Sequence, residues 1–141
     1  MSRVLAFDYG TKRVGVSVTD QLQIIANTLE TVETKKIFEF IKTYLLKEEV
    51  ECFVVGYPYA HGHTQNQVVV HIEKFIAELT KLYPTLPVYK IDESFTSKIA
   101  QRTLLMSGVN KSERRKRGNI DAISSNLILQ TYLETKSNKF G

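Results

Sequence analysis

The chain has 141 residues, of which 43% are apolar and 10% aromatic, so it is long enough for one folded domain and too apolar for a disordered chain. Its 19 lysines and arginines exceed its 15 acids by four, and residues 111–117 alone hold five basic residues and one acid. The other residues are therefore formally neutral, which excludes a generally basic protein, and no run of about 20 apolar residues indicates a membrane-spanning helix.

The N-terminal residues and the single cysteine bear on where the protein is located. The first residues lack the long apolar run of a signal peptide, because Asp8 interrupts them. The single cysteine, Cys52, cannot form an internal disulfide, and it stands in an apolar run typical of a buried strand. We therefore expect a cytoplasmic protein in a reducing setting.

The first half of the chain alternates at period two and then changes to a helical period. Residues 4–8 and 14–18 indicate strands joined by a tight turn, and residues 24–29 could add a third, antiparallel strand. From residue 34 onward, apolar side chains between Ile37 and Leu45 recur at helical spacing.

The second half alternates strand and helix. The predicted elements are a strand over 51–56, a helix over 68–82, a strand over 87–92, a helix over 97–106 and a last helix over 119–134 with Asn119 as its N-cap. This order predicts an α/β fold with a mixed five-stranded sheet, its later strands parallel and helices on both faces. We expect a single domain over residues 1–141 whose apolar residues are accounted for by one core.

Several acids stand where elements end or begin. Asp8 ends the first predicted strand, Asp92 and Glu93 end the last strand, and Asp121 lies in the first turn of the last predicted helix. Ligands of open α/β sheets bind beyond the carboxyl ends of strands, so these acids are candidates to meet. A hard divalent cation such as Mg²⁺ would relieve their repulsion, and two such ions can bind a phosphodiester and activate water. Each acid alone could instead form a turn or favour a helix dipole.

Four stretches, in order, resemble the YqgF family (RuvX type), Holliday-junction-resolvase-like nucleases associated with pre-16S rRNA processing. They are LAFDYGTKRVGVSVTD at 5–20, FVVGYP at 53–58, IDESFTS at 91–97 and NIDAISS at 119–125. The resemblance covers nearly the whole chain and implies an RNase H-like fold. It also implies a nuclease that uses Mg²⁺ or Mn²⁺.

The resemblance implies that the catalytic, metal-binding acids of this chain are Asp8, Glu93 and Asp121. Supporting roles fall on Asp92 beside the glutamate, on Gly10 in the turn beside Asp8, and on small residues of the last helix. Those small residues are Ser124 and Ser125.

Nucleic-acid contacts are expected from basic residues beside these acids. They are Lys12, Arg13, Lys111, Arg114, Arg115, Lys116 and Arg117. Such cations supply sequence-independent, salt-dependent affinity for phosphates. The alternative for the cluster at 111–117 is a solvated charged loop.

The sequence also departs from the family pattern. Ser94 stands where the family has an arginine, and the loop with His61 and His63 replaces a characteristic family loop. These two histidines match no closed zinc site. The three acids are retained, so we expect the protein to be active. We also expect its substrate contacts to differ from those of the family.

The leading hypothesis is a metal-dependent nuclease acting on structured nucleic acid, with 5′-end processing of pre-16S rRNA as its role in ribosome biogenesis. Two alternatives stay open: a Holliday-junction resolvase, and a non-catalytic nucleic-acid-binding factor of ribosome maturation. The turn at residues 8–12 also resembles the phosphate turn of actin-like ATPases, but those proteins need two such domains. Expected partners are nucleic acid and ribosomal precursor particles, with no membrane, and the protein is expected as a monomer or weak homodimer.

Overall fold

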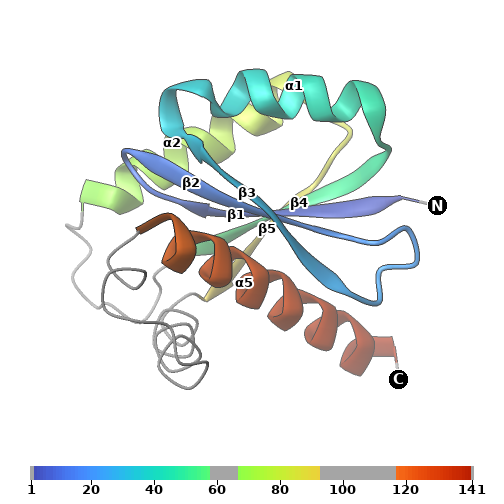
Figure 1. The fold of residues 1–141 in the computed structure, drawn as a ribbon. Helices are drawn as coiled ribbons and strands as arrows, with labels where there is room; N and C mark the ends of the chain where they lie inside the picture. Colours follow the sequence, from blue (N-terminus) through green and yellow to red (C-terminus); the bar gives the residue numbers. More distant parts are fainter. Residues whose placement is uncertain (1, 58–66, 93–116, 141) are drawn as a thin grey trace.

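One five-stranded sheet forms the centre of the molecule (Figure 1). The computed structural model describes residues 2–57, 67–92 and 117–140. Its strands are β1 (Arg3–Tyr9), β2 (Arg13–Thr19), β3 (Ala26–Glu33), β4 (Val50–Tyr57) and β5 (Val88–Asp92), in the spatial order β3-β2-β1-β4-β5. The first three strands pair antiparallel, whereas β1, β4 and β5 pair parallel. The predicted mixed sheet with parallel later strands is confirmed.

Helices cover both faces of this sheet, as predicted. On one face lie the 3₁₀ turn η1 (Thr34–Lys36), α1 (Ile37–Lys47) and α2 (Gln67–Leu82), while α5 (Arg117–Phe140) crosses the other face (Figure 1). The predicted helix over 97–106 lies outside the described residues. No helix in the described part of the chain is both long and apolar enough to cross a membrane.

Among the described residues the core consists of two apolar clusters, one on each face of the sheet. The larger cluster joins Leu5 and Phe7 of β1 to side chains of α1 and α2. The smaller cluster joins Val4 and Ala6 of β1 to Ile128 of α5 and to part of β4. Successive side chains of a strand point to opposite faces, so odd-numbered positions of β1 face α1 and α2, and even-numbered positions face α5.

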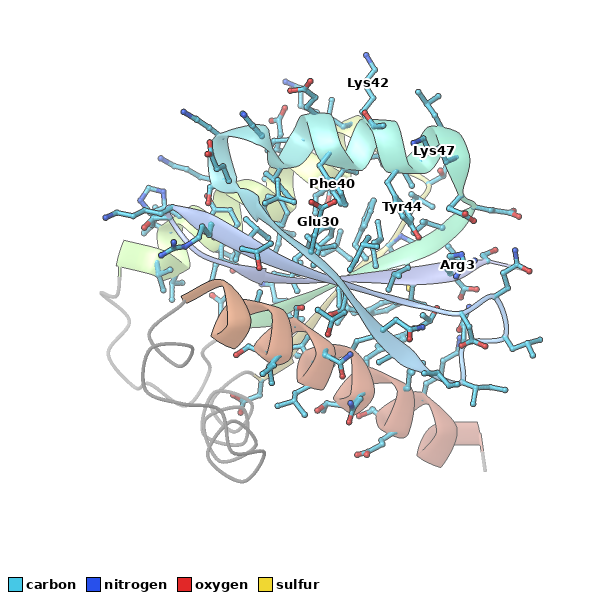
Figure 2. All side chains as sticks on the ribbon, in the orientation of Figure 1. Arg3, Glu30, Phe40, Lys42, Tyr44 and Lys47 are labelled. Carbon is cyan, nitrogen blue, oxygen red and sulfur yellow. The ribbon has the colours of Figure 1, made fainter. Side chains whose placement is uncertain are left out.

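Helix α1 shows how the predicted periodicity becomes packing. Ile37 and Ile41 are buried, and Phe40 and Tyr44 pack against the larger cluster with ring centroids 6.1 Å apart. Figure 2 shows Phe40 and Tyr44 between α1 and the sheet, whereas Lys42 points away from the sheet. Fully burying a large apolar side chain stabilises the fold by about 1.5–3 kcal/mol, which fixes α1 on this face.

Two expectations from the sequence are wrong in detail. The apolar residues are not all accounted for by one core, because Leu22, Ile24 and Ile25 of the β2–β3 turn are 59%, 68% and 58% exposed. Helix α5 begins at Arg117 and ends at Phe140, so Asn119 lies inside it and is not its N-cap. Capping residues only suggest helix ends, and here the helix extends past both predicted ends.

Candidate functional site

Asp8 lies at the carboxyl end of the central strand. Strand β1 is flanked by β2 and β4, and Asp8 pairs with Gly15 of β2. Because Val4 and Ala6 face α5, Asp8 two positions further along falls on the α5 side of the sheet. Asp8 is half-buried, and its cross-strand neighbour Gly15 carries no side chain that could cover the carboxylate.

Helix α5 is joined to the sheet close to Asp8 by a buried pair of serines. The hydroxyls of Ser17 on β2 and Ser125 on α5 are 2.7 Å apart, and both residues are fully buried. Ser17 pairs with Ala6 of β1, so Ser125 marks the level of Ala6 along the strand. The helix therefore approaches the sheet closely enough for a direct side-chain contact between two small residues.

The direction of α5 brings its first turns to the same end of the sheet as Asp8. Near the other end of α5, Lys136 forms an ion pair of 3.6 Å with Glu51, the second residue of β4. Position 121 precedes Ser125 by four residues, about 6 Å along the helix axis. Asp8 lies about 6.6 Å beyond Ala6 along β1, so the helix backbone at position 121 is level with Asp8. Asp121 lies in the second turn of α5, and its side chain is outside the described part of the structure.

Asp92 ends β5 at the same edge of the sheet but on the other face. It pairs with Tyr57 of β4. Strand β5 is the second strand from β1, so the two strands are about 10 Å apart. Ile91 packs on the α5 side, while the Lys90 ammonium donates to Glu73 of α2 at 2.8 Å. Side-chain alternation therefore assigns Asp92 to the α2 side, opposite to Asp8. Glu93, the predicted ligand that follows it, lies outside the described residues.

The α2 side of this edge is tied together by Lys90. Its ammonium lies 4.6 Å from the ring centre of Tyr57 as well as bonding to Glu73. The Glu73 carboxylate is hydrogen-bonded to the side chain of Lys90 and also to that of Tyr57. These two bonds, the one from Lys90 more than the one from Tyr57, hold the pKa of Glu73 below its usual value. Within the described ranges, no group of three side chains that could bind a metal comes together. Of the three predicted metal ligands, the described side chains include that of Asp8.

The turn between β1 and β2 is fixed next to Asp8. A Cβ atom added to Gly10 would lie 2.6 Å from the backbone oxygen of Arg13, too close for any other residue without a backbone shift. Thr34 holds the turn from outside: its hydroxyl donates to the Gly10 carbonyl at 2.6 Å, and its amide donates to the Lys12 carbonyl at 3.0 Å. Glycine at this position therefore has a steric reason in the fold.

This turn also forms a cationic hollow of about 640 Å³ that the sequence did not reveal in full. It is lined by Thr11, Lys12, Arg13, Glu33 and Lys35. Three cations face one acid there, and Glu33 pairs with Lys35 at 3.7 Å. Lys35 has no motif around it, and it lies at this end of the sheet because β3 ends at Glu33 beside Arg13 of β2 and because Thr34 is hydrogen-bonded to the turn.

Other predicted positions cannot be placed in the same way. Lys111, Arg114, Arg115 and Lys116 lie outside the described residues, as do Ser94, His61 and His63. Arg117 is the first residue of α5, and its side chain is not described. The basic segment therefore remains a prediction from the sequence.

The structure gives Asp20 a purely structural role. It follows β2, at the end of the sheet opposite to Asp8, and its carboxylate accepts hydrogen bonds from the amides of Ile24 at 2.8 Å and Ile25 at 2.9 Å. These backbone donors lower the pKa of Asp20. Of the four aspartates in the chain, this one is a turn former.

The chain matches a known protein family over nearly its whole length. The family model described as "RuvX: Holliday junction resolvase" matches residues 2–135. The chain belongs to the RuvX family. The expectation of this family, drawn from the four motifs, is thereby confirmed.

Curated relatives of this RuvX chain share its length. A protein of Bacteroides thetaiotaomicron named "Putative pre-16S rRNA nuclease" is 46% identical over 96% of this chain and 99% of the relative. A protein of the same name from Christiangramia forsetii is 44% identical over 94% of this chain and 98% of the relative.

Solved structures confirm the fold of the RuvX chain. The structure titled "T. thermophilus RuvC in complex with Holliday junction substrate" matches with a TM-score of 0.58 at 19% identity and covers 96% of each chain. A second structure of Thermus thermophilus RuvC matches with a TM-score of 0.54 at 17% identity, over 95% of this chain and 96% of that one. The expected RNase H-like α/β fold is borne out by this likeness.

Proposed function

We propose that the protein is a metal-dependent nuclease that hydrolyses phosphodiester bonds of structured nucleic acid, with pre-16S rRNA as its substrate. The observation that carries the proposal is the position of Asp8. It lies at the carboxyl end of the central strand, on the side covered by α5 and level with position 121 of that helix. Membership of the RuvX family and the names of the curated relatives support the same reaction.

The metal ions in this proposal are Mg²⁺ or Mn²⁺, held by Asp8, Glu93 and Asp121. Carboxylate oxygens are the ligands that both ions prefer, and Gly15 leaves the α5 side of Asp8 uncovered by a cross-strand side chain. When bound, the ions polarise the phosphate and supply a water nucleophile at neutral pH. Asp92 falls on the other face, so we assign it a supporting role at the end of β5.

The cations near Asp8 have a separate task, which is to hold the nucleic-acid backbone. Lys12 is exposed, and Arg13 and Lys35 line the same hollow. The basic residues of the segment 111–117 precede Asp121 in sequence and add positive charge beside the last acid. Phosphate contacts of this kind position a substrate without reading its sequence. An enzyme of precursor rRNA works where ribosomes are assembled, so we propose a cytoplasmic location.

A second candidate function is the resolution of Holliday junctions in DNA. It is favoured by the description of the family model, and the same acids would serve it. The two functions differ in substrate and not in the chemistry at Asp8, so they are separated by offering both substrates to one preparation.

The test is a cleavage assay with a labelled pre-16S rRNA fragment and a labelled four-way DNA junction, each with Mg²⁺, Mn²⁺ or EDTA. We expect metal-dependent cleavage of the RNA, which Asp8→Asn and Asp121→Asn reduce by at least about 100-fold because each removes a ligand charge. Substrate binding in EDTA should survive both substitutions. Preferred cleavage of the junction would instead favour the resolvase.

A matched control distinguishes loss of a site acid from loss of any acid. Glu39 is exposed on α1, on the face of the sheet away from α5, so Glu39→Gln should cleave as the wild type does. Cleavage that is equal in the wild type and in both aspartate variants would come from a contaminating nuclease and would refute the assignment. Binding of RNA without any metal-dependent cleavage would favour a non-catalytic maturation factor.

A further inference from the structure

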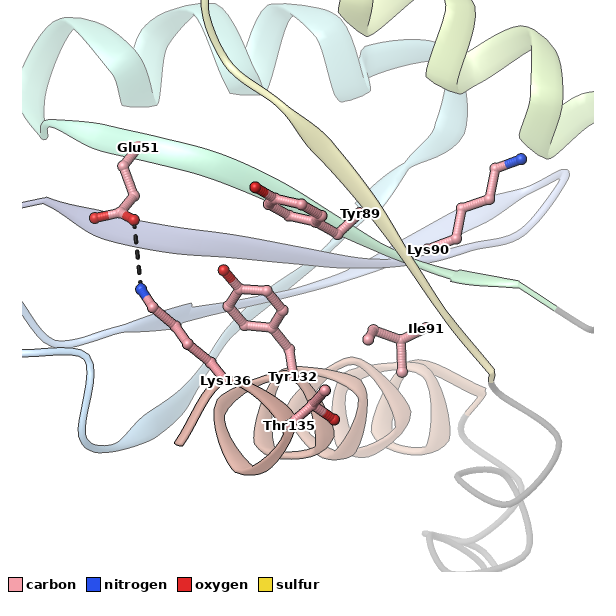
Figure 3. A pocket seen from close by; sticks show the side chains of 7 residues that line it. All are labelled: Glu51, Tyr89, Lys90, Ile91, Tyr132, Thr135 and Lys136. Carbon is pink, nitrogen blue, oxygen red and sulfur yellow. Dashed lines mark ion pairs between the residues drawn. The ribbon is translucent and has the colours of Figure 1, made fainter. Parts of the chain in front are cut away.

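A groove lies between β5 and the C-terminal half of α5, away from Asp8 and from position 121. It has a volume of about 440 Å³ and is lined by Glu51, Tyr89, Ile91, Tyr132, Thr135 and Lys136 (Figure 3). Its volume falls in the range of small-molecule sites. Lys90 also borders the groove, but its ammonium bonds to Glu73, and in Figure 3 it points away from the two tyrosines.

Two tyrosine rings form the centre of this groove. The ring centroids of Tyr89 and Tyr132 are 5.6 Å apart and their planes differ by 31°. Tyr132 packs against the smaller core cluster, and its hydroxyl lies 3.6 Å from the Cys52 sulfur. Tyr89 is 45% exposed. The groove therefore presents an exposed aromatic ring supported by a second ring that the core holds in place.

The charges around the rings largely cancel. The Lys136 ammonium pairs with the Glu51 carboxylate at 3.6 Å and donates to the Gln23 side-chain oxygen at 2.7 Å. The usual pKa of a tyrosine already lies well above physiological pH, and burial raises the pKa of Tyr132 further, so its hydroxyl carries no charge. A neutral groove with aromatic walls suits an uncharged planar group better than it suits a phosphate.

We propose that this groove binds one unpaired nucleobase of the substrate, stacked on Tyr89. Every base has a π-face, so stacking on tyrosine does not depend on base identity. Tyr89 pairs with Val54 of β4 and Val54 pairs with Ala6 of β1, so Tyr89 lies about 10 Å across the sheet and about 6.6 Å along the strands from Asp8, a separation of about 12 Å. Successive nucleotides of one strand are about 3.4 Å apart when stacked, so about three to four nucleotides span this distance. The groove thus lies within reach of a single-stranded extension of nucleic acid bound at the Asp8 edge.

This inference rests on the proposed nuclease function for its ligand, but its test requires no cleavage. The probe is an RNA hairpin with a five-nucleotide unpaired extension that carries 2-aminopurine, whose fluorescence falls when the base stacks. The reference is the same hairpin with a blunt end, and both are titrated in EDTA. We expect quenching on binding and an affinity for the extended hairpin that is at least about 5-fold higher than for the blunt one.

Two substitutions at one position make the result specific. Tyr89→Ala removes the ring and should abolish the quenching and bring the affinity ratio close to one, whereas Tyr89→Phe keeps the ring and should retain both. Circular dichroism of Tyr89→Ala checks that the variant is folded. A ratio that is the same in the wild type and in Tyr89→Ala overturns the proposal. Unquenched 2-aminopurine at every position of the extension overturns it too, and would leave the groove to an apolar side chain of a protein partner.

Discussion

The buried serine pair that joins α5 to the sheet makes the sharpest prediction about stability. Ser125→Ala removes one hydroxyl and leaves the buried Ser17 hydroxyl without the partner that lies 2.7 Å away in the wild type. An unsatisfied buried polar group costs about 1–3 kcal/mol. Alanine is favoured over serine in a helix by about 0.5 kcal/mol, which offsets part of this cost. The free energy of unfolding should therefore fall by about 0.5–2.5 kcal/mol.

A double variant isolates the contribution of the contact between the two hydroxyls. Replacing both serines by alanine removes both hydroxyls of the pair together, so neither is left buried without the other. The summed stability losses of the two single variants should then exceed the loss of the double variant Ser17→Ala/Ser125→Ala by about 1 kcal/mol or more, which is the signature of a direct contact.

Urea denaturation followed by circular dichroism measures all four proteins of this cycle. For a chain of this length, each kcal/mol corresponds to a shift in Tm of about 3 °C, so thermal unfolding provides a second reading. A coupling energy within about 0.4 kcal/mol of zero would refute the reasoning, because it would mean that the two hydroxyls do not depend on each other.

Three further predictions concern other parts of the fold. Gly10→Ala should lower the free energy of unfolding by about 1–3 kcal/mol, because the new Cβ meets the Arg13 carbonyl oxygen at 2.6 Å; wild-type stability in urea would show that the turn adapts freely. Glu73→Gln should cost about 0.5 kcal/mol at pH 7, because its ion pair with Lys90 is partly exposed and screened by solvent. The folded-state pKa of Glu73 is lowered, so this contribution is present above the unfolded-state pKa near 4.5 and is lost as the pH falls through the folded-state value; an equal cost at pH 7 and pH 2.5 would contradict it. Burial raises the pKa of the Cys52 thiol, so Ellman's reagent at pH 8 should react with it only as the protein unfolds in urea, and rapid reaction of the native protein would contradict its buried position.

Much of the fold could be predicted because its signals are local. The alternation of Val14, Val16 and Val18 predicted the strand and the side chains that it packs into the larger cluster. The spacing of Ile37 and Ile41 predicted the helix and the face that it buries. The same alternation places Asp8 and Asp92 on opposite faces of the sheet. The sequence alone does not show this, because it does not say which helix the neighbouring residues of each strand contact.

The parts that escaped prediction depend on contacts between distant residues. Lys35 joins the cationic turn because Thr34 bonds to Gly10, and no pattern in the sequence couples those positions. Tyr89 and Tyr132 are far apart in the chain, and each is an ordinary aromatic residue until β5 and α5 bring the rings together. The exposed residues Ile24 and Ile25 read as ordinary strand residues, because the composition of an apolar run does not say whether a partner element covers it.

We propose that Asp8, Glu93 and Asp121 hold the same metal ions, and this shared site can be tested by measuring the binding of Mn²⁺. Electron paramagnetic resonance measures free Mn²⁺ during titration of the wild type, Asp8→Asn, Asp121→Asn and the double variant, with Glu39→Gln as the control. We predict saturable binding by the wild type and the control, a loss of about 10- to 100-fold in affinity for each single variant, and little further loss in the double variant. Mn²⁺ affinity that is unchanged by Asp8→Asn would contradict the claim.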